Sequence, residues 1–478
     1  MPKIDIDGKE IDAPASATIL NAAGQAGISI PTLCHIEGIP PATSCMLCVV
    51  KDLKSGRLVP SCGTPVEDGM RIATDCAEVR QARHEILNLL LSEHVGDCTA
   101  PCTLICPAHL DTPLMLRKIA DGDLAAAAWI ARRDLTLPIT LGYICEAPCE
   151  KGCRRGQLDK SITICNLHRH VAEAFPHIKH TSSKSSKTTA VIGSGPAGLA
   201  AAWNLRLRGH RCAVFDDGEI PGGMLREFGE KTLPRNVIDA EIGLIQQLGV
   251  EFFLNQIVTA GELAERFDAV IITDTPIAEN RKECEKIFNA KSHRQPIIAI
   301  GHGKSAAMRA DVFLRNLPQQ EEKPRFNSRI RNLRHTELEE LTKNCPVPDL
   351  CEASIEIEAA RCLHCDCRKS ENCHLREYAQ EYDARQNEFL AGERKHIEII
   401  GDSGQVVYEP GKCIKCGICV RITTRAGEEF GMTFTNRGFD TKVEVPFGME
   451  LSTGMRKTAE ECVNSCPTGA LALRDKRV

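Results

Sequence analysis

Closely spaced cysteines constrain this chain more than any other feature of its sequence. The chain has 478 residues and 25 cysteines, and most of these stand within a few positions of another cysteine. Thiolates at such spacing are typical ligands of iron–sulfur clusters or of zinc. The first residues, 1–7, alternate as a strand does, so no signal peptide is expected. In a cytoplasmic chain, many cysteines indicate metal sites rather than disulfides.

Charge and hydropathy exclude two classes of protein. Lys and Arg total 59 against 64 Asp and Glu, which gives a net charge of -5. This balance argues against a nucleic-acid partner. No apolar run reaches the ~18 residues of a membrane-spanning helix. We therefore expect a cytoplasmic chain of several domains without a transmembrane segment.

Residues 1–75 have the order strand, turn, strand, helix and cysteine loop, with the helix expected at 17–26. This order predicts a β-grasp ferredoxin domain. The spacing Cys-x10-Cys-x2-Cys-x13-Cys suits a [2Fe–2S] cluster. A structural zinc site is the alternative, although zinc sites favour two matched Cys-x2-Cys pairs. The four predicted ligands are Cys34, Cys45, Cys48 and Cys62.

Residues 76–179 are predicted to be helical and to hold two [4Fe–4S] clusters, because they contain too many ligands for one. The candidates are His94, Cys98, Cys102, Cys106, Cys145, Cys149, Cys153, Cys165 and His168. Cys165 precedes His168 by three residues, so on a helix both would share one face. Either of them could occupy the last ligand position.

Two resemblances assign these ligands. The first 110 residues resemble the amino-terminal part of the large iron–sulfur subunit of respiratory complex I and related hydrogenase subunits, which share the [2Fe–2S] spacing and the His-x3-Cys opening. The later gaps more closely resemble the double-cluster domain of the glutamate synthase small subunit and of dihydropyrimidine dehydrogenase. That resemblance implies one cluster on His94, Cys98, Cys102 and Cys153, and a second on Cys106, Cys145, Cys149 and His168.

A nucleotide-binding fold is predicted over 188–320, after a polar Ser/Lys linker. An apolar strand, a Gly-x-Gly-x-x-Gly turn, a helix and a second strand ending in an acidic residue form a pyrophosphate-binding unit. The stretch 222–226 resembles the FAD-binding half of the glutamate synthase family, which implies FAD as the cofactor. The predicted cofactor-binding residues are Gly193, Gly195, Gly198, Asp216, Gly222, Gly223 and Gly301.

This Rossmann-type domain is expected to be truncated. A full member of the family would insert a second nucleotide fold for NAD(P)H, whereas only a short stretch separates the strand at 267–273 from an expected return strand at 295–301. No second glycine fingerprint occurs between them. A Rossmann shell kept only as scaffold is the alternative.

Two further [4Fe–4S] sites are predicted beyond a linker at 321–360. The segment 361–395 has four closely spaced cysteines, with zinc as the alternative. The ferredoxin-like domain 396–478 begins with a hairpin at 397–408, and Thr423 stands where a second cluster would need a cysteine. The predicted ligands are Cys362, Cys365, Cys367 and Cys373 for one site, and Cys413, Cys416, Cys419 and Cys466 for the other.

The sequence thus predicts a multidomain α+β and α/β chain with one [2Fe–2S] cluster, four [4Fe–4S] clusters and FAD. No catalytic motif is recognised. We expect an electron-transfer subunit of a multisubunit redox complex. The complex I resemblance implies an NAD(H)-binding flavin subunit and a hydrogenase- or formate-dehydrogenase-like subunit as partners, with free ferredoxin as a further candidate. The alternative is an NAD(P)H-dependent flavin oxidoreductase of the glutamate synthase small-subunit type.

Overall fold

The structure, a computed structural model, describes residues 1–176, 185–273, 285–318, 325–330, 332–343, 354–389, 395–401 and 405–473. The chain forms two compact units. Unit 1 comprises residues 1–99, 324–344 and 365–478, and unit 2 comprises residues 100–323 and 345–364. The finer domain boundaries stay predictions. The predicted linkers lie partly outside the described residues.

Unit 1 begins with a five-stranded mixed sheet in the order β2-β1-β5-β3-β4. Strands β1 and β5 run parallel, and the other pairs are antiparallel. The elements are β1 (Lys3–Ile6), β2 (Lys9–Asp12), α1 (Ile19–Gln25), β3 (Val49–Asp52), β4 (Leu58–Pro60) and β5 (Arg71–Ala73). Alternation buries Ile4 and Ile6 in one core with Ile19 of α1. Thr18 starts α1 in a capping box with Asn21. The predicted strands and helix are therefore present, whereas the β-grasp assignment stays a prediction.

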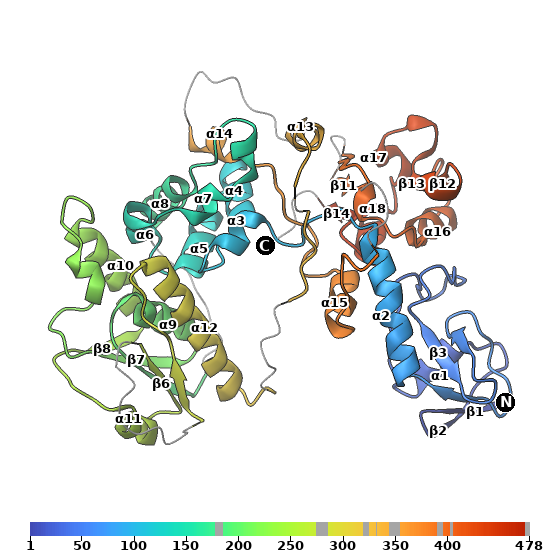
Figure 1. Ribbon diagram of the computed structural model, residues 1–478, viewed down its shortest axis with the longest axis horizontal. Coiled ribbons are helices and arrows are strands. Elements are labelled where there is room, and N and C mark those ends of the chain that lie inside the picture. The colour runs from blue at the N-terminus through green and yellow to red at the C-terminus, as the bar shows by residue number, and fades with distance from the viewer. Residues whose placement is uncertain are drawn as a thin grey trace. The chain divides into compact units, whose positions relative to one another are not determined.

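The rest of unit 1 consists of helices and two small sheets (Figure 1). The helices are α2 (Ala77–Ser92), α13 (His335–Lys343), α15 (His374–Glu381), α16 (Ile418–Arg425), α17 (Leu451–Gly454) and α18 (Ala459–Ser465). The strands are β11 (Val406–Tyr408), β12 (Thr433–Thr435), β13 (Lys442–Glu444) and β14 (Leu471–Leu473).

The predicted hairpin at 397–408 is present in part. Ile400 and Tyr408 exchange two backbone hydrogen bonds of 2.8 Å each in an antiparallel bridge, and β11 also pairs along its whole length with β14, near the end of the described chain. The pairing of short apolar strands depends on burial in the tertiary structure, so local sequence does not reveal β14 as a partner of β11.

The first part of unit 2 is helical, as predicted. Its helices are α3 (Pro101–Ile105), α4 (Thr112–Ala120), α5 (Leu124–Leu135), α6 (Pro138–Ile144), α7 (Pro148–Lys151) and α8 (Ile164–Ala174), and α14 (Ile355–Ala360) packs against α4. The second part is a five-stranded parallel sheet in the order β10-β9-β6-β7-β8. Its elements are β6 (Thr188–Ile192), α9 (Pro196–Leu207), β7 (Arg211–Phe215), α10 (Arg235–Gln247), β8 (Val250–Phe253), α11 (Ala260–Arg266), β9 (Ala269–Ile272), β10 (Ile287–Asn289) and α12 (Pro296–Leu314).

A buried carboxylate joins the two parts of unit 2. Glu241 of α10 accepts hydrogen bonds from the backbone N–H groups of Ile139 and Thr140, at 2.9 and 2.7 Å. Its Oε1 also lies 3.8 Å from the buried guanidinium of Arg132 in α5. Since a buried charge needs such partners, these contacts fix the helical part against the sheet.

The expected return strand at 295–301 is wrong, because this stretch begins helix α12. Pro296 occupies the first turn, where its missing N–H costs nothing. Ile297, Ile300 and Ala307 are buried at the three- and four-residue spacing of a helix. The run Ile-Ile-Ala-Ile alone suits a strand, but its continuation to Leu314 follows the helical period. Within the described residues, no helix has the length and apolar character needed to cross a membrane.

Candidate iron–sulfur and nucleotide sites

The four predicted [2Fe–2S] ligands lie together in unit 1. Cys34, Cys45, Cys48 and Cys62 are all buried in loops around α1, β3 and β4. A hydrogen bond with the Cys62 thiol lowers the pKa of Cys48 to about 6. Hydrogen bonds with the Cys45 and Cys62 thiols likewise hold the pKa of Cys34 far below its usual range. The same contacts raise the pKa of Cys45 and Cys62, so the four thiols are in mutual contact, as the ligands of one [2Fe–2S] cluster would be.

The predicted ferredoxin-like ligands line one cavity of unit 1. Cys413, Cys416, Cys419 and Cys466 surround about 350 Å³ of empty space, together with apolar side chains such as Ile418 and Leu471. Cys413 and Cys416 flank a turn in which Lys415 has a positive φ of 56°, and Cys419 lies in the first turn of α16. The cavity therefore offers four thiols in apolar surroundings, as a cubane site does.

Thr423 has a structural role, consistent with a single cluster in this segment. Its buried hydroxyl donates to the carbonyl of Cys419 at 3.0 Å and accepts from the backbone N–H of Met432 at 3.0 Å. It thus joins helix α16 to the strand that follows.

Sequence reasoning missed the arginine that connects these two sites. The Arg421 guanidinium donates to the carbonyls of Pro40 and Cys34 at 2.7 Å each, and to that of Cys416 at 3.5 Å. One side chain thus forms hydrogen bonds with both the [2Fe–2S] loop and the loop around the ferredoxin-like cavity of unit 1. Nothing in the local sequence marks this arginine, because its partners lie far away in the chain.

A second cavity, in unit 2, gathers most of the second predicted cubane set. Cys106, Cys145, Cys149, Cys165 and His168 line about 280 Å³ of empty space, with Leu and Ile side chains completing the wall. Burial raises the pKa of the Cys106 thiol to about 11, with smaller contributions from the charges of Cys149 and Cys145. The predicted ligands of this cluster are therefore close together in apolar surroundings.

Cys165 and His168 both reach this cavity from helix α8, as the three-residue spacing predicted. The Cys165 thiol shares hydrogen bonds with the Cys145 and Cys149 thiols, which raise its pKa. His168 is buried, and burial lowers its pKa to about 4. Its Nδ1 has no hydrogen-bond partner among the described residues. The thiol contacts favour Cys165 as the fourth ligand, whereas the family resemblance favours His168.

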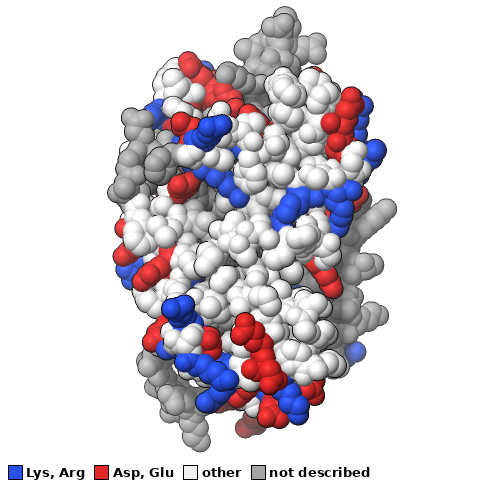
Figure 2. Space-filling view, turned by 90° about the vertical axis from the view of Figure 1, so that its right-hand side faces the viewer, with Lys and Arg blue, Asp and Glu red and all other residues white. Residues whose placement is uncertain are grey.

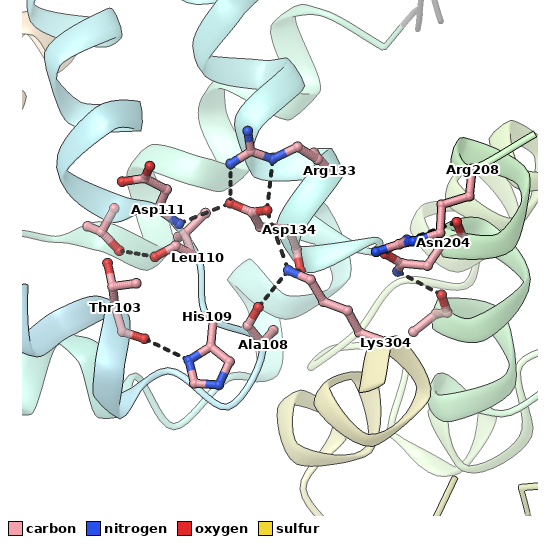
Figure 3. Close-up of polar contacts among 12 residues, drawn as sticks. Thr103, Ala108, His109, Leu110, Asp111, Arg133, Asp134, Asn204, Arg208 and Lys304 are labelled. Carbon is pink, nitrogen blue, oxygen red and sulfur yellow. Dashed lines mark hydrogen bonds and ion pairs between the residues drawn. The ribbon is translucent and has the colours of Figure 1, made fainter. Parts of the chain in front are cut away.

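A lysine from the nucleotide-binding fold reaches the helical part of unit 2 next to this cavity (Figure 3). Lys304 Nζ of α12 donates to the carbonyl of Ala108 at 2.9 Å and lies 3.4 Å from Asp134 Oδ1. Asp134 in turn accepts two hydrogen bonds from Arg133, at 2.9 and 2.8 Å. Burial lowers the pKa of Lys304, while the Asp134 charge opposes that change. The site therefore holds a largely buried cation that bonds the carbonyl of Ala108, two residues after the predicted ligand Cys106.

The other predicted sets divide between the units. His94 and Cys98 belong to unit 1, whereas Cys102 and Cys153 belong to unit 2. Cys362 belongs to unit 2, whereas Cys365, Cys367 and Cys373 belong to unit 1. In the described part of the chain, no three His, Cys, Asp or Glu side chains converge as the ligands of one metal ion would. A cubane gives each ligand its own iron, so its ligands need not converge on a point.

The glycine turn has the geometry of a phosphate-binding loop. Gly193 has a φ of 99°, and a Cβ at Gly198 would overlap the Gly193 carbonyl oxygen. Gly195 precedes helix α9, whose amino terminus carries unsatisfied N–H groups. Asp216 Oδ2 accepts from the Ser194 N–H at 2.5 Å, and Oδ1 accepts from the Gly218 N–H at 2.8 Å. Each oxygen keeps a further lone pair, so these residues fit a bound dinucleotide.

The other three predicted cofactor-binding residues, all glycines, lie in two different places. Gly222 has a φ of 125°, and Gly223 lies so close to Gly195 that a Cβ would meet its backbone at 3.0 Å. Both therefore lie against the glycine turn. Gly301 lies inside helix α12, where a Cβ would overlap the carbonyl of Pro107. Close helix packing explains this glycine, and its predicted cofactor contact stays untested.

Three family models match successive parts of the chain. A 2Fe–2S iron-sulfur cluster binding domain matches residues 2–76, and the 4Fe–4S cluster domain II of dihydropyrimidine dehydrogenase matches residues 78–180. An NAD(P)-binding Rossmann-like domain matches residues 191–247. The fold and the cysteine sites therefore define an iron–sulfur electron-transfer protein of the oxidoreductase class, and the composite predicted from sequence is confirmed.

Curated relatives match only part of this composite. The chain is 35% identical over 216 residues to the NADP(+)-dependent formate dehydrogenase subunit beta of Moorella thermoacetica, covering 38% of this chain and 30% of the relative. It is 31% identical to an NAD-dependent dihydropyrimidine dehydrogenase subunit PreT homolog of Salmonella typhi, covering 39% and 49%. It is 34% identical to the glutamate synthase [NADPH] small chain of Bacillus subtilis, covering 28% and 29%. The chain thus spans less than half the length of each of these relatives.

Proposed function

We propose that this chain is an iron–sulfur electron-transfer subunit of a multisubunit redox complex, and that it also binds FAD. The observation that carries the proposal is the gathering of buried cysteines at separate sites: the four [2Fe–2S] cysteines and the two cysteine-lined cavities. Bound iron–sulfur clusters supply one-electron transfer over a wide range of potentials. The chain's own residues bind the clusters, exclude water and set the local charge.

The partners that we propose are an NAD(H)-binding flavin subunit on one side and a catalytic subunit of the formate dehydrogenase or hydrogenase type on the other. Free ferredoxin is a further candidate. The formate dehydrogenase subunit among the relatives supports a partner of this kind. On the face shown in Figure 2, acidic and basic side chains are interspersed around a broad uncharged area. Docking on that face would rely on local charge pairs rather than on a field of one sign.

A second candidate function is direct oxidation of NAD(P)H by a flavin on this chain. The match of residues 191–247 to an NAD(P)-binding Rossmann-like domain favours it. Against it, the described residues form one parallel sheet with one glycine turn, so nicotinamide and flavin would need the same site.

Metal analysis tests the proposed function. One [2Fe–2S] and four [4Fe–4S] clusters require about 18 irons per chain, with matching acid-labile sulfide. The chain should therefore be purified without oxygen and assayed for iron, sulfide, zinc and FAD. About four zinc ions with little iron would contradict the electron-transfer function.

A further inference from the structure

We propose that His94, Cys98, Cys367 and Cys373 together bind one [4Fe–4S] cluster inside unit 1. This ligand set differs from the two sets that sequence spacing and family resemblance imply. The inference rests on the proposed electron-transfer function, and it specifies how one of its clusters is held. All four residues belong to unit 1, although the chain passes through most of unit 2 between Cys98 and Cys367.

Cys98 and Cys367 are adjacent through their backbones. The Cys367 N–H donates to the Cys98 carbonyl at 3.3 Å, and both thiols are buried. The Cys98 Sγ also accepts from the Ser328 backbone N–H at 3.4 Å and lies 3.2 Å from the Ser328 hydroxyl. Three segments that are distant in sequence therefore meet at Cys98, with Ser328 at its sulfur and Cys367 at its carbonyl.

Cys373 is held against the same place by its own helix. It precedes α15, and Arg376 in the first turn of that helix donates to the Thr99 hydroxyl at 3.3 Å and to the Ser370 carbonyl at 3.1 Å. These bonds connect the helix both to the residue after Cys98 and to the loop between Cys367 and Cys373. Burial raises the pKa of the Cys367 and Cys373 thiols, and a negative charge on Cys98 raises both further.

His94 follows the end of α2. Its side chain is partly exposed, but its Nδ1 is buried and has no hydrogen-bond partner among the described residues. The next residue, Val95, donates its N–H to the Gly411 carbonyl at 2.8 Å, which places His94 beside Lys412. An imidazole nitrogen that is buried without a partner is costly unless it binds a ligand, and iron is one that it binds well.

Lys412 connects the histidine to the thiols. Its buried stem packs against Gly96, which lies between His94 and Cys98 in the chain. The same stem and the Cys367 sulfur both lie beside Gly469, within 4 Å of where its Cβ would be. The Lys412 ammonium forms an ion pair with Glu409 at 2.6 Å. A buried cation at this position would offset the negative charge of three cluster thiolates.

The assignment also places this cluster next to the ferredoxin-like cavity. Lys369, between Cys367 and Cys373, donates to the carbonyls of Val463 and Cys466 at 2.7 and 2.5 Å. The Cys373 thiol lies 3.9 Å from the carbonyl of Pro467. With the Arg421 contacts, unit 1 would hold three clusters in the order [2Fe–2S], ferredoxin-like cubane and histidine-ligated cubane. This grouping separates four cysteines from their predicted partners: Cys102, Cys153 and Cys362, which lie in unit 2, and Cys365, which lies in unit 1.

Pairwise iron counts on the full chain test the grouping. Removing one ligand should cost about four irons, and removing a second ligand of the same cluster should cost no more. We therefore expect C98S, C367S and the double variant C98S/C367S each to lose about four irons, and C98S/C102S to lose about eight. The opposite pattern, about eight for C98S/C367S and about four for C98S/C102S, would overturn the proposal.

Spectroscopy gives a second readout, because serine oxygen can replace sulfur as a ligand without loss of iron. His94→Gln, Cys98→Ser and Cys367→Ser should then change the same EPR signal, and Cys362→Ser should change a different one. Nitrogen hyperfine coupling to that signal should be present in the parent chain and absent in His94→Gln. If His94→Gln and Cys367→Ser change different signals, the grouping is wrong.

Two controls separate local from global effects. Cys76→Ser replaces a cysteine at the start of α2 that is in no predicted site, and it should keep all iron. The EPR signal of the [2Fe–2S] cluster shows whether unit 1 still folds. Where a serine variant loses that signal, the same cysteine is changed to aspartate instead, because carboxylates also bind iron. The total iron of the parent chain tests the proposed function, whereas the pairwise pattern tests this assignment.

Discussion

At the scale of single residues, one ligand position in unit 2 has two candidates, Cys165 and His168. Because the Cys165 thiol contacts the thiols of Cys145 and Cys149, we expect Cys165→Ser to remove about four irons or to shift one EPR signal. His168→Asn should keep the iron and that signal. Iron analysis and EPR on the two variants check this. Loss of the signal in His168→Asn alone would assign the position to the histidine.

Lys304 gives a second prediction at this scale. It places a partly buried cation near Cys106, and the Cys106 charge in turn raises the pKa of Lys304, after the larger effects of burial and Asp134. Reduction adds negative charge to a cluster, so loss of this cation should make reduction harder. We expect Lys304→Met to lower the reduction potential of the neighbouring cluster by on the order of tens of millivolts. Potentiometric EPR measures this change.

Lys304→Arg, which keeps the charge, is the matched control for that experiment. It should retain the potential of the parent chain. An equal decrease in both variants would show that packing rather than charge sets the potential.

At the scale of elements, the packing of α12 on α9 depends on a glycine. A Cβ at Gly303 would overlap the carbonyl oxygen of Ala197, so Gly303→Ala should destabilise unit 2 by roughly 1–3 kcal/mol. Gly243 also lies in a helix but has no heavy atom within 4 Å of an added Cβ. Gly243→Ala should therefore be neutral or stabilise the fold by up to about 1 kcal/mol. Denaturant unfolding followed by the fluorescence of buried Trp203 compares them. Equal midpoints would contradict the close contact.

Local patterns predicted the elements whose partners are close in sequence. The strand–turn–strand of β1 and β2, helix α2 and the unit from β6 to β7 all depend on periodicity and glycine positions within a few dozen residues. One element was assigned wrongly, and the main strand partner of another was not predicted. For α12, a β-branched apolar run outweighed a helical period that was present in the sequence. For β11, pairing with β14 depends on tertiary burial that local sequence does not contain.

At the scale of the whole molecule, the cysteine groups within short loops could be predicted, but the grouping of distant ligands could not. Spacing alone connects Cys413, Cys416 and Cys419, and Cys466 lines the same cavity as these three. Cys98 instead meets Ser328, some 230 residues away, and also Cys367. The family resemblance implied Cys102 as its partner, and neither spacing nor periodicity reveals that one compact unit interrupts the other.

The last prediction is that the purified chain, with its clusters and FAD in place, will not oxidise NADH or NADPH with an artificial dye. Hydride transfer requires the nicotinamide to lie against the flavin, and a second nucleotide fold normally holds it there. The described residues place β9 and β10 next to each other in one parallel sheet, and Gln295 then leads directly into α12. Too little chain remains between β9 and α12 for a further βαβ unit, which needs about 30 residues or more.

Adding a flavin subunit that oxidises NADH should then allow NADH to reduce the clusters, measured as bleaching of their visible absorption. Gly198→Val provides the matched variant, because a side chain there would overlap Gly193 and close the glycine turn. If the turn binds FAD, this variant should lose its flavin while unit 1 keeps the [2Fe–2S] signal. Rapid NADH oxidation by the chain alone, lost in Gly198→Val, would reverse the assignment. The chain would then be a flavin oxidoreductase that uses the nicotinamide directly, and its clusters would carry electrons away from that flavin.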